Sequence, residues 1–305
     1  MQRSARRRVD AVLLLDKPRG ISSNTALQAA RRRFNAAKAG HGGTLDPMAS
    51  GLLPVLFGEA TKFSSGLLEG GKTYLATVTL GARTDSGDAE GNVIAARPVT
   101  VDDAALAAAL EGFRGEIVQV PPMHSALKRD GKPLYLLARK GVEVERQPRR
   151  VRIDRLVLHG RDGNDLRIEV ACSKGTYIRT LADDLGERLG CGAHLSALRR
   201  TAVAEFDVGQ AWTLEGLDAL PDAELPAALL PVDRLVARLG SVMLDAGPAR
   251  LFCHGQVVAA GGEGAGPRRI YGEAGRFLGL GELAEGGLLR PLRLLVDSAQ
   301  PADNH

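Results

Sequence analysis

Residues 73–80 read TYLATVTL, and this stretch decides the fold class. Its side chains alternate, with Tyr74, Ala76, Val78 and Leu80 on one side and three threonines and a leucine on the other. A period of two is typical of a strand that buries one face against a core. The stretch therefore predicts a β-strand in a sheet that is covered on one side.

Strands and helices flank this stretch without a regular alternation. The apolar run at 11–15 predicts a buried strand, after which a polar cap starts a helix that continues to about Phe34. The candidate caps are Ser22, Ser23 and Asn24. Strand patterns recur at 117–120, 151–159 and 166–172, and helical patterns at 101–113 and 176–189. Hairpins mixed with helices predict an α+β domain with a mixed, largely antiparallel central sheet flanked by helices.

The composition changes near the C-terminus. Residues 214–239 are acidic, helical in pattern and punctuated by proline, whereas 241–296 are rich in glycine with short strand-like pieces. These pieces lie at 256–259, 268–271, 276–280 and 292–296. A small C-terminal β-barrel is the expected structure.

Composition narrows the class of protein. The chain has 305 residues, 44% of them hydrophobic, which is enough for a large domain and a small one. No apolar run approaches the roughly 20 residues that cross a bilayer, so we expect no membrane association. Three cysteines, Cys172, Cys191 and Cys253, form no CxxC pair, and Cys191 with His194 makes only an isolated C-x-x-H. We expect no disulfide framework, no metal site and a cytoplasmic location.

Basic residues are clustered rather than abundant. The net charge is +4 and the isoelectric point is near 9.1, yet arginine and lysine gather at 3–8, 31–33 and 128–152, and 201–233 contain none. A basic face opposite an acidic one indicates a polyanionic partner. Because only 4% of residues are aromatic, recognition of a folded RNA by backbone shape fits better than stacking along a single strand.

A glycine-rich loop at 41–51, HGGTLDPMASG, contains a single carboxylate at Asp46. Glycines permit close approach to the main chain, so a large partner could lie against this loop, and Pro47 favours an extended Asp46. The alternative is an ordinary Asp-Pro turn. The loop is a candidate catalytic loop if other segments supply partners for Asp46.

A second motif points to a different activity. Residues 66–73, GLLEGGKT, satisfy the phosphate-binding pattern GxxxxGK[ST], which taken literally predicts an NTPase. That loop requires a preceding strand and a following helix. Because Thr73 opens a strand, we favour a glycine turn that enters the strand.

Several ordered segments together resemble one family. They are HGGTLDPMASG at 41–51, GEATKFS at 58–64, KTYLATVTLGARTDSGDAEG at 72–91, SALK at 125–128 and CSKGTYIRTLADDLG at 172–186, with LLLDKPRGISSN at 13–24 and GCGAHLSALRR at 190–200. This set resembles the bacterial tRNA pseudouridine-55 synthases of the TruB family. The resemblance implies the pseudouridine synthase fold with a PUA-like C-terminal barrel. It also implies isomerisation of the T-loop uridine of tRNA without a cofactor.

The resemblance assigns three catalytic residues. Asp46 is the essential carboxylate, which either attacks the ribose carbon or removes a ribose proton. Arg179 is its charge partner and is expected to hold the carboxylate ionised and oriented, the alternative being a surface helix arginine. Tyr74 is expected to stack against the base and to relay a proton, the alternative being a core tyrosine.

The resemblance also assigns substrate-binding residues. His41 is expected to enter the T-loop in place of the extruded uridine, while Tyr177 and Leu198 pack around the base or simply fill the core. Three lysines are expected to contact phosphates: Lys17, Lys62 and Lys128.

The resemblance predicts a division of the chain into domains. We expect a basic tail at 1–10, a catalytic domain at 11–235 with a basic RNA-clamping insertion at 122–150, a PUA-like domain at 241–297 and a tail at 298–305. We expect a monomer that binds the T-loop and T-stem of tRNA without a nucleotide cofactor. A non-catalytic tRNA-binding or folding chaperone, and a synthase acting on another RNA, are the alternatives.

Overall fold

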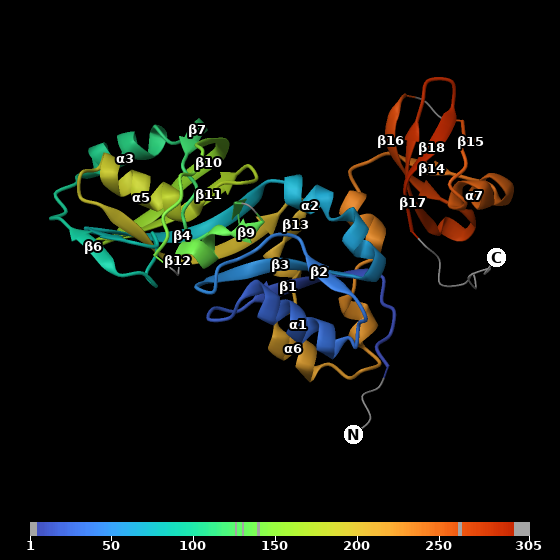
Figure 1. Ribbon diagram of the computed structural model, residues 1–305, viewed down its shortest axis with the longest axis horizontal. Helices are drawn as coiled ribbons and strands as arrows, with labels where there is room; N and C mark the ends of the chain where they lie inside the picture. Colours follow the sequence, from blue (N-terminus) through green and yellow to red (C-terminus); the bar gives the residue numbers. More distant parts are fainter. Residues whose placement is uncertain (1–4, 126, 130, 139–140, 262–263, 296–305) are drawn as a thin grey trace.

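A nine-stranded sheet forms the centre of the protein in this computed structural model, which describes residues 5–125, 127–129, 131–138, 141–261 and 264–295. The main path runs β1-β3-β12-β4-β11-β10-β7, with β2 beside β3 and β13 beside β12 (Figure 1). The strands are β1 Ala11–Lys17, β2 Ala39–His41, β3 Ala49–Phe57, β4 Lys72–Leu80, β7 Gly115–Gln119, β10 Arg149–Asp162, β11 Asp165–Cys172, β12 Ala193–Val203 and β13 Phe206–Asp207. Among the described strands of this sheet, only β3 and β12 pair in parallel, so the prediction of a mixed, largely antiparallel central sheet is confirmed.

The strand predicted from TYLATVTL is β4, and it lies inside the sheet between β11 and β12. On its apolar side, Ala76, Val78 and Leu80 are buried, whereas Leu75 on the opposite side is 42% exposed. The alternation in the sequence therefore identifies the face of the sheet that packs against the hydrophobic core.

The two strands of the parallel pair, β3 and β12, were not predicted. Nearly every residue of β3 is buried on both faces, so the strand has no alternation, and it contains both Gly51 and Pro54. β12 carries two arginines and two register irregularities, which obscure its period. Both strands become recognisable only through their neighbours in the sheet.

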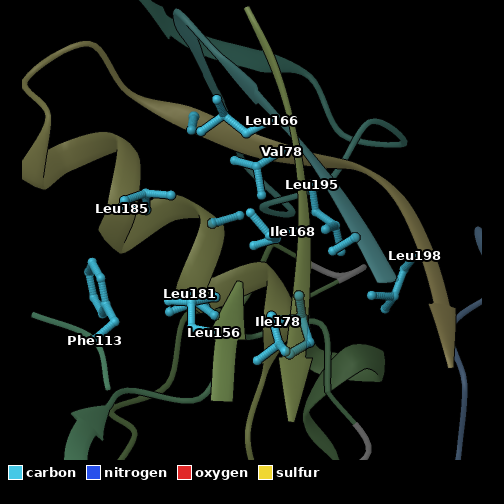
Figure 2. Close-up of a cluster of buried hydrophobic side chains, with 14 of the residues drawn as sticks. Val78, Phe113, Leu156, Leu166, Ile168, Ile178, Leu181, Leu185, Leu195 and Leu198 are labelled. Atoms are coloured by element: carbon cyan, nitrogen blue, oxygen red, sulfur yellow. The ribbon is translucent and has the colours of Figure 1, made fainter. Parts of the chain in front are cut away.

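Two helices cover the apolar face of β4. They are α3 Asp103–Glu111 and α5 Ile178–Arg188, which lie side by side over the sheet (Figure 1). Figure 2 shows the resulting core, where Leu181 and Leu185 of α5 meet Val78 and Ile168 of the sheet. Both helices are slightly shorter than the sequence predicted.

A second core lies under β1 and β3. The helix α1 Ser23–Arg33 begins at the N-cap Ser22, whose side chain accepts a hydrogen bond from the Thr25 amide, and it buries the face predicted from the sequence. The helix α6 Leu214–Ala219 packs beside it. Arg33 donates to the α6 carbonyl of Leu217 and pairs with Asp222, so this arginine of the basic run serves an internal contact.

The GxxxxGK[ST] segment has the reverse order of a phosphate-binding loop. Here the helix α2 Ser65–Glu69 comes first and strand β4 follows. The Lys72 ammonium donates to the carbonyls of Leu67, Leu68 and Gly70 at 3.1, 2.9 and 2.6 Å. The lysine thus satisfies carbonyls at the C-terminal end of a helix, and the interpretation as a turn entering a strand is confirmed.

The C-terminal part forms a five-stranded sheet with the order β14-β16-β17-β18-β15, packed against one helix. These elements are β14 Ser241–Met243, α7 Ala246–Cys253, β15 Val258–Ala259, β16 Gly266–Tyr271, β17 Phe277–Leu283 and β18 Leu288–Leu294. The helix α7 was not predicted. Within the described residues the pairing does not close from β14 to β15, so the expected barrel takes the form of a strongly wrapped sheet.

The C-terminal sheet is fixed to the rest of the chain by specific contacts. Phe277 packs on Phe63 with ring centroids 5.6 Å apart, and the Tyr271 hydroxyl donates to Asp233 at 2.8 Å. Arg269 donates to the Leu239 carbonyl at 2.8 Å. In Figure 1 this sheet stands apart at the upper right, on the side of α2 rather than of α3.

The remaining elements are short. The two hairpins are β5 Ala82–Thr84 with β6 Val93–Ala96, and β8 Lys128–Arg129 with β9 Lys132–Pro133, followed by α4 Leu134–Ala138. Single turns of 3₁₀ helix lie at Gly58–Phe63, Val208–Gln210, Leu225–Ala228, Val232–Val236 and Glu273–Gly275. Among the described residues, no helix has the length and apolarity needed to span a bilayer.

Candidate active site

The loop at 41–51 connects β2 to β3, and Asp46 begins a tight turn in it. The Ala49 amide donates to the Asp46 carbonyl at 3.1 Å, with Pro47 in the first central position. The Gly20 amide donates to the Pro47 carbonyl at 2.8 Å, which ties the turn to the segment after β1. The Asp-Pro turn and the candidate catalytic loop are therefore the same structure.

The glycines of this loop pack against the protein itself. Gly51 has φ +105°, and a Cβ there would lie 2.2 Å from the Arg200 carbonyl oxygen in β12. A Cβ on Gly42 would lie 2.5 Å from Leu67. We expected the glycines to admit a partner to the main chain, but at these two positions they admit neighbouring segments of this chain.

Asp46 and Arg179 form an ion pair. Arg179 is the second residue of α5, and its Nη2 lies 3.1 Å from the Asp46 Oδ2. The arginine side chain is only 6% exposed, whereas the carboxylate is 38% exposed. The sequence pattern placed Arg179 off the apolar stripe of its helix, and the structure shows that this direction leads to Asp46 rather than to solvent.

The same guanidinium contacts a second carboxylate, which the sequence interpretation missed. Arg179 Nη1 lies 3.5 Å from Asp88 Oδ2, and Asp88 is nearly fully buried. The Ser86 hydroxyl and the Glu90 amide donate to Asp88 at 2.6 and 3.1 Å. The available signal was the position of Asp88 in the matched segment TDSGDAEG, 84–91.

Two backbone carbonyls complete the contacts of Arg179. Its Nη1 donates to the Ser86 carbonyl at 3.1 Å and its Nη2 to the His124 carbonyl at 2.5 Å. The planar guanidinium thus holds together three segments of the chain, which contain Asp46, Asp88 and His124. A lysine, with a single flexible ammonium, would do this less well.

Burial and charge act in opposite directions on Asp46. Burial raises the pKa of the Asp46 carboxyl above its ordinary value, and the Arg179 guanidinium opposes that rise. We expected Arg179 to keep the carboxylate ionised, and it acts in that direction, but desolvation outweighs it. The site therefore holds a carboxylate that is more basic than an exposed one.

A cavity of about 170 Å³ opens beside this pair. Side chains from several elements line it, among them Asp46, Tyr74, Ser125, Tyr177, Arg179 and Leu198. The structure thus brings together all three predicted catalytic residues and two predicted base-packing residues. Leu198 also belongs to the main core, at the edge shown in Figure 2, so the expectation that it fills the core is confirmed and its contact with a base stays a prediction.

Tyr74 and Tyr177 are half-buried on two sides of the cavity. Burial raises the pKa of both phenols above the ordinary value. Tyr177 precedes α5, and its amide and carbonyl bond to the Gln119 side chain of β7 at 3.0 and 3.2 Å. Each ring is therefore held by a different part of the sheet.

His41 lies outside the lining of the cavity, at the end of β2. Its Nδ1 is buried without a hydrogen-bond partner among the described residues, and burial lowers the pKa of the imidazole. An unpartnered ring nitrogen beside the catalytic loop is available to a ligand after a small movement.

The three lysines are placed differently from one another. Lys17 is fully buried and donates to the carbonyls of Pro18 and Ile21 at 2.9 and 2.8 Å, and burial lowers the pKa of its ammonium to about 8. This position contradicts the predicted phosphate contact. Lys62 pairs with Glu59 and donates to the Leu294 carbonyl at 3.4 Å, far from the cavity lining. Lys128 lies in β8, and its side chain is outside what the structure describes.

Within the described ranges no three His, Cys, Asp or Glu residues lie close enough to hold a metal ion. The cavity is lined instead by one carboxylate, one guanidinium and two phenols. These groups can attack or deprotonate a carbon centre, stabilise charge and stack on a planar ring.

Three sequence families match consecutive parts of the chain. They are TruB family pseudouridylate synthase (N terminal domain) at 31–178, tRNA pseudouridylate synthase B C-terminal domain at 179–237, and Pseudouridine synthase II TruB, C-terminal, at 240–295. Together they cover the site, the C-terminal part and all strands of the central sheet except β1.

Individual proteins match over nearly the whole length. The tRNA pseudouridine synthase B of Aromatoleum aromaticum is 60% identical over 293 residues, which are 96% of this chain and 95% of that protein. The tRNA pseudouridine synthase B of Azoarcus sp. is 57% identical over 97% of this chain and 98% of its own. Among solved structures, a chain of a Cbf5-Nop10-Gar1 complex superposes with a TM-score of 0.70 at 27% identity, covering 93% of this chain and 84% of that one.

Proposed function

The chain belongs to the TruB family of pseudouridine synthases, and from this premise we propose that it converts the T-loop uridine of tRNA to pseudouridine. The reaction is an isomerisation. The bond from uracil N1 to ribose C1′ breaks, a bond from C5 to C1′ forms, C5 loses a proton and N1 gains one. No electron or group donor enters this balance, so the reaction itself requires no cofactor.

One observation carries the proposal: the Asp46 carboxylate lies 3.1 Å from a nearly buried guanidinium at the wall of a cavity bounded by two phenols. A carboxylate held by a fixed donor is oriented before substrate arrives. Attack on C1′ and removal of a ribose proton both require its ionised form. The Arg179 contact favours that form against the cost of burial.

The phenols supply the base-binding surface. Stacking of uracil on an aromatic ring is worth roughly 1 to 3 kcal/mol, comparable to the few kcal/mol needed to extrude a nucleotide. Tyr74 also places a hydroxyl in the cavity wall for the proton that leaves C5. Tyr177 and Leu198 close the opposite side.

Recognition of tRNA uses surfaces around the cavity. We propose that His41, with its unpartnered Nδ1, enters the T-loop, and that the basic insertion at 122–150, including Lys128, contacts the T-stem backbone. Lys62 contacts phosphate only if its bonds to Glu59 and Leu294 open, and Lys17 is excluded by its burial.

We keep the proposed domains at 11–235 and 241–297. The matched family regions change between residues 237 and 240, and the C-terminal sheet begins at Ser241, which supports this division. We propose that the protein acts as a cytoplasmic monomer. The proposed tail at 298–305 lies outside the described residues.

Tritium release tests the function. A T-loop RNA tritiated at uridine C5 loses the label to water when C5 bonds to the ribose, and we expect stoichiometric release by the wild-type protein. Asp46→Asn should release none while it keeps its affinity for the RNA, and that affinity should fall steeply with salt. Tight RNA binding by the wild type without tritium release would contradict the proposed isomerase activity and favour a tRNA-folding chaperone. Release from another RNA in preference to tRNA would contradict the substrate.

A further inference from the structure

Arg200 is a fully buried arginine beside the cavity. It lies in β12, is 1% exposed and is among the largest fully buried side chains of the protein. No carboxylate forms an ion pair with it within the part of the chain that the structure describes. A buried guanidinium without a counter-ion is costly, so its other contacts must explain its presence.

The Arg200 guanidinium forms hydrogen bonds to the chain both before and after Asp46. Its Nε donates to the Leu52 carbonyl at 2.7 Å, and its Nη2 and Nη1 donate to the carbonyls of Gly43 and Thr44 at 3.1 and 3.4 Å. Two of these carbonyls precede Asp46 in the loop and one follows it. One planar group therefore holds both ends of the loop that carries the catalytic carboxylate.

The same guanidinium reaches Tyr74. Arg200 is paired with Tyr74 in the register of β12 and β4, and its positive charge acts on the Tyr74 phenol. Burial raises the pKa of the Tyr74 phenol, and Cys172 and Asp46 act in the same direction. Arg200 is the group that opposes them.

The surroundings of Arg200 are otherwise cationic. Lys17, His41 and Lys72 interact with it electrostatically, and burial lowers the pKa of each of these three groups. Burial also lowers the pKa of Arg200. The Tyr74 phenol interacts with this positive region and can accept negative charge during a reaction.

We propose that Arg200 is a positioning residue, which holds the Asp46 loop and the Tyr74 hydroxyl in fixed positions relative to each other. It also stabilises negative charge on the phenol oxygen during proton transfer from uracil C5. This inference rests on the proposed isomerase function. In the transfer, the phenol proton first passes to water, and the phenolate then takes the C5 proton, so the phenol is regenerated and the proton given to water balances the one that N1 gains. The charge that develops between these two events lies beside the guanidinium.

Arg200→Gln and Arg200→Lys test the proposal, with Arg199→Gln as the matched control. Arg199 is the next residue on β12, points to the opposite face and pairs with Asp16. The chain has four tyrosines, so labelling with trifluorotyrosine, whose phenol is more acidic, gives four sets of ¹⁹F signals to titrate, and Tyr74→Phe assigns one set.

In Arg200→Gln we expect the Tyr74 phenol to titrate at higher pH than in the wild type, because the opposing charge is gone. The kcat should fall roughly 10- to 100-fold with KM little changed, since the loss is in alignment and charge stabilisation. Arg200→Lys should keep the Tyr74 titration near that of the wild type but lose about tenfold in kcat, because one ammonium cannot replace the three donor contacts to Leu52, Gly43 and Thr44. Arg199→Gln should change neither quantity.

An unchanged Tyr74 titration in folded Arg200→Gln would overturn the electrostatic role. If that variant does not fold, Arg200→Lys decides, and a wild-type kcat in the folded lysine variant overturns the proposal. The titration is measured on the free protein. It therefore remains informative even if the wild type releases no tritium, an outcome that contradicts the isomerase function itself.

Discussion

Ser23 and Leu45 exchange two hydrogen bonds: the Leu45 amide donates to the Ser23 hydroxyl at 2.8 Å, and that hydroxyl donates to the Leu45 carbonyl at 2.9 Å. All of these atoms are buried. The residue before Asp46 is thereby attached to the first turn of α1.

Ser23→Ala should therefore weaken both the fold and the site. Two buried backbone groups lose their partner, which should lower the free energy of unfolding by about 1–3 kcal/mol. Because Asp46 is the next residue, kcat should fall as well. Urea unfolding and tritium release measure the two effects.

The matched control is Ser22→Ala. This change removes the N-cap bond to the Thr25 amide and should cost about 1 kcal/mol of stability without altering kcat. Equal kcat losses in both variants would show that the Ser23 contact has no specific effect on the site.

Arg179→Lys should inactivate the protein although the charge is kept. A single ammonium cannot contact Asp46, Asp88 and the two carbonyls of Ser86 and His124 together. We expect kcat to fall by roughly 10²-fold or more while RNA affinity is retained. Single-turnover tritium release and a filter-binding assay separate these quantities, and a pure loss of affinity would contradict the assignment.

Asp46→Asn should stabilise the free protein near neutral pH. Because burial raises the pKa of the folded carboxyl above its ordinary value of 3.8, the folded state binds this proton more tightly than the unfolded chain. The corresponding stability is present below the unfolded pKa and is lost as the pH rises through the folded pKa. The asparagine does not ionise, so the variant does not lose this stability as the pH rises. The difference in melting temperature between Asp46→Asn and the wild type should therefore be largest near neutral pH and vanish toward about pH 3. A constant difference across this range would contradict the raised pKa.

Gly51→Ala should be severely destabilising. The new Cβ would combine a positive φ of +105° with a contact of 2.2 Å to the β12 backbone, so β3 and β12 would have to separate. We expect a loss above about 3 kcal/mol, or no folding. Gly163→Ala is the control, because Gly163 also has positive φ but has open space around its Cβ position. Its cost should be confined to backbone strain of about 1 kcal/mol.

Lys72→Ala should destabilise the protein without any nucleotide effect. Three carbonyls at the end of α2 lose their donor, which should cost about 1–2 kcal/mol. Lys174→Ala, which removes an exposed ion pair with Glu69, should cost less than about 1 kcal/mol. Stabilisation of the wild type by ATP that disappears in Lys72→Ala would restore the NTPase interpretation.

The sequence predicted those elements whose residues carry a period. β4 and α5 each bury one face, so their apolar positions repeat every two residues or every three to four residues. β3 is buried on both faces and β12 carries the buried Arg200 among its apolar residues, so neither has a readable period. Elements at the centre of a sheet are specified by their neighbours, and these come from distant parts of the chain.

The proposed catalytic trio was predicted from family motifs, and the structure places its members around one cavity. Asp88 and Arg200 were missed for a physical reason. Charged side chains are ordinarily exposed, so a sequence gives no sign that a particular Asp or Arg is buried until its partners are known. The partners of Arg200 lie in a loop and in a strand that are far away along the chain.

Gly43 and Arg200 are 157 residues apart in the sequence yet share a hydrogen bond. Closing a loop of this length is slow, because its entropy must be lost before any contact compensates for it. During synthesis the loop that carries Asp46 emerges long before β12. It lacks its hydrogen bonds to Arg200 until β12 inserts between β3 and β4. The geometry around Asp46 therefore forms only after the central sheet is complete. An unfinished chain that lacks β12 already contains Asp46 but is inactive.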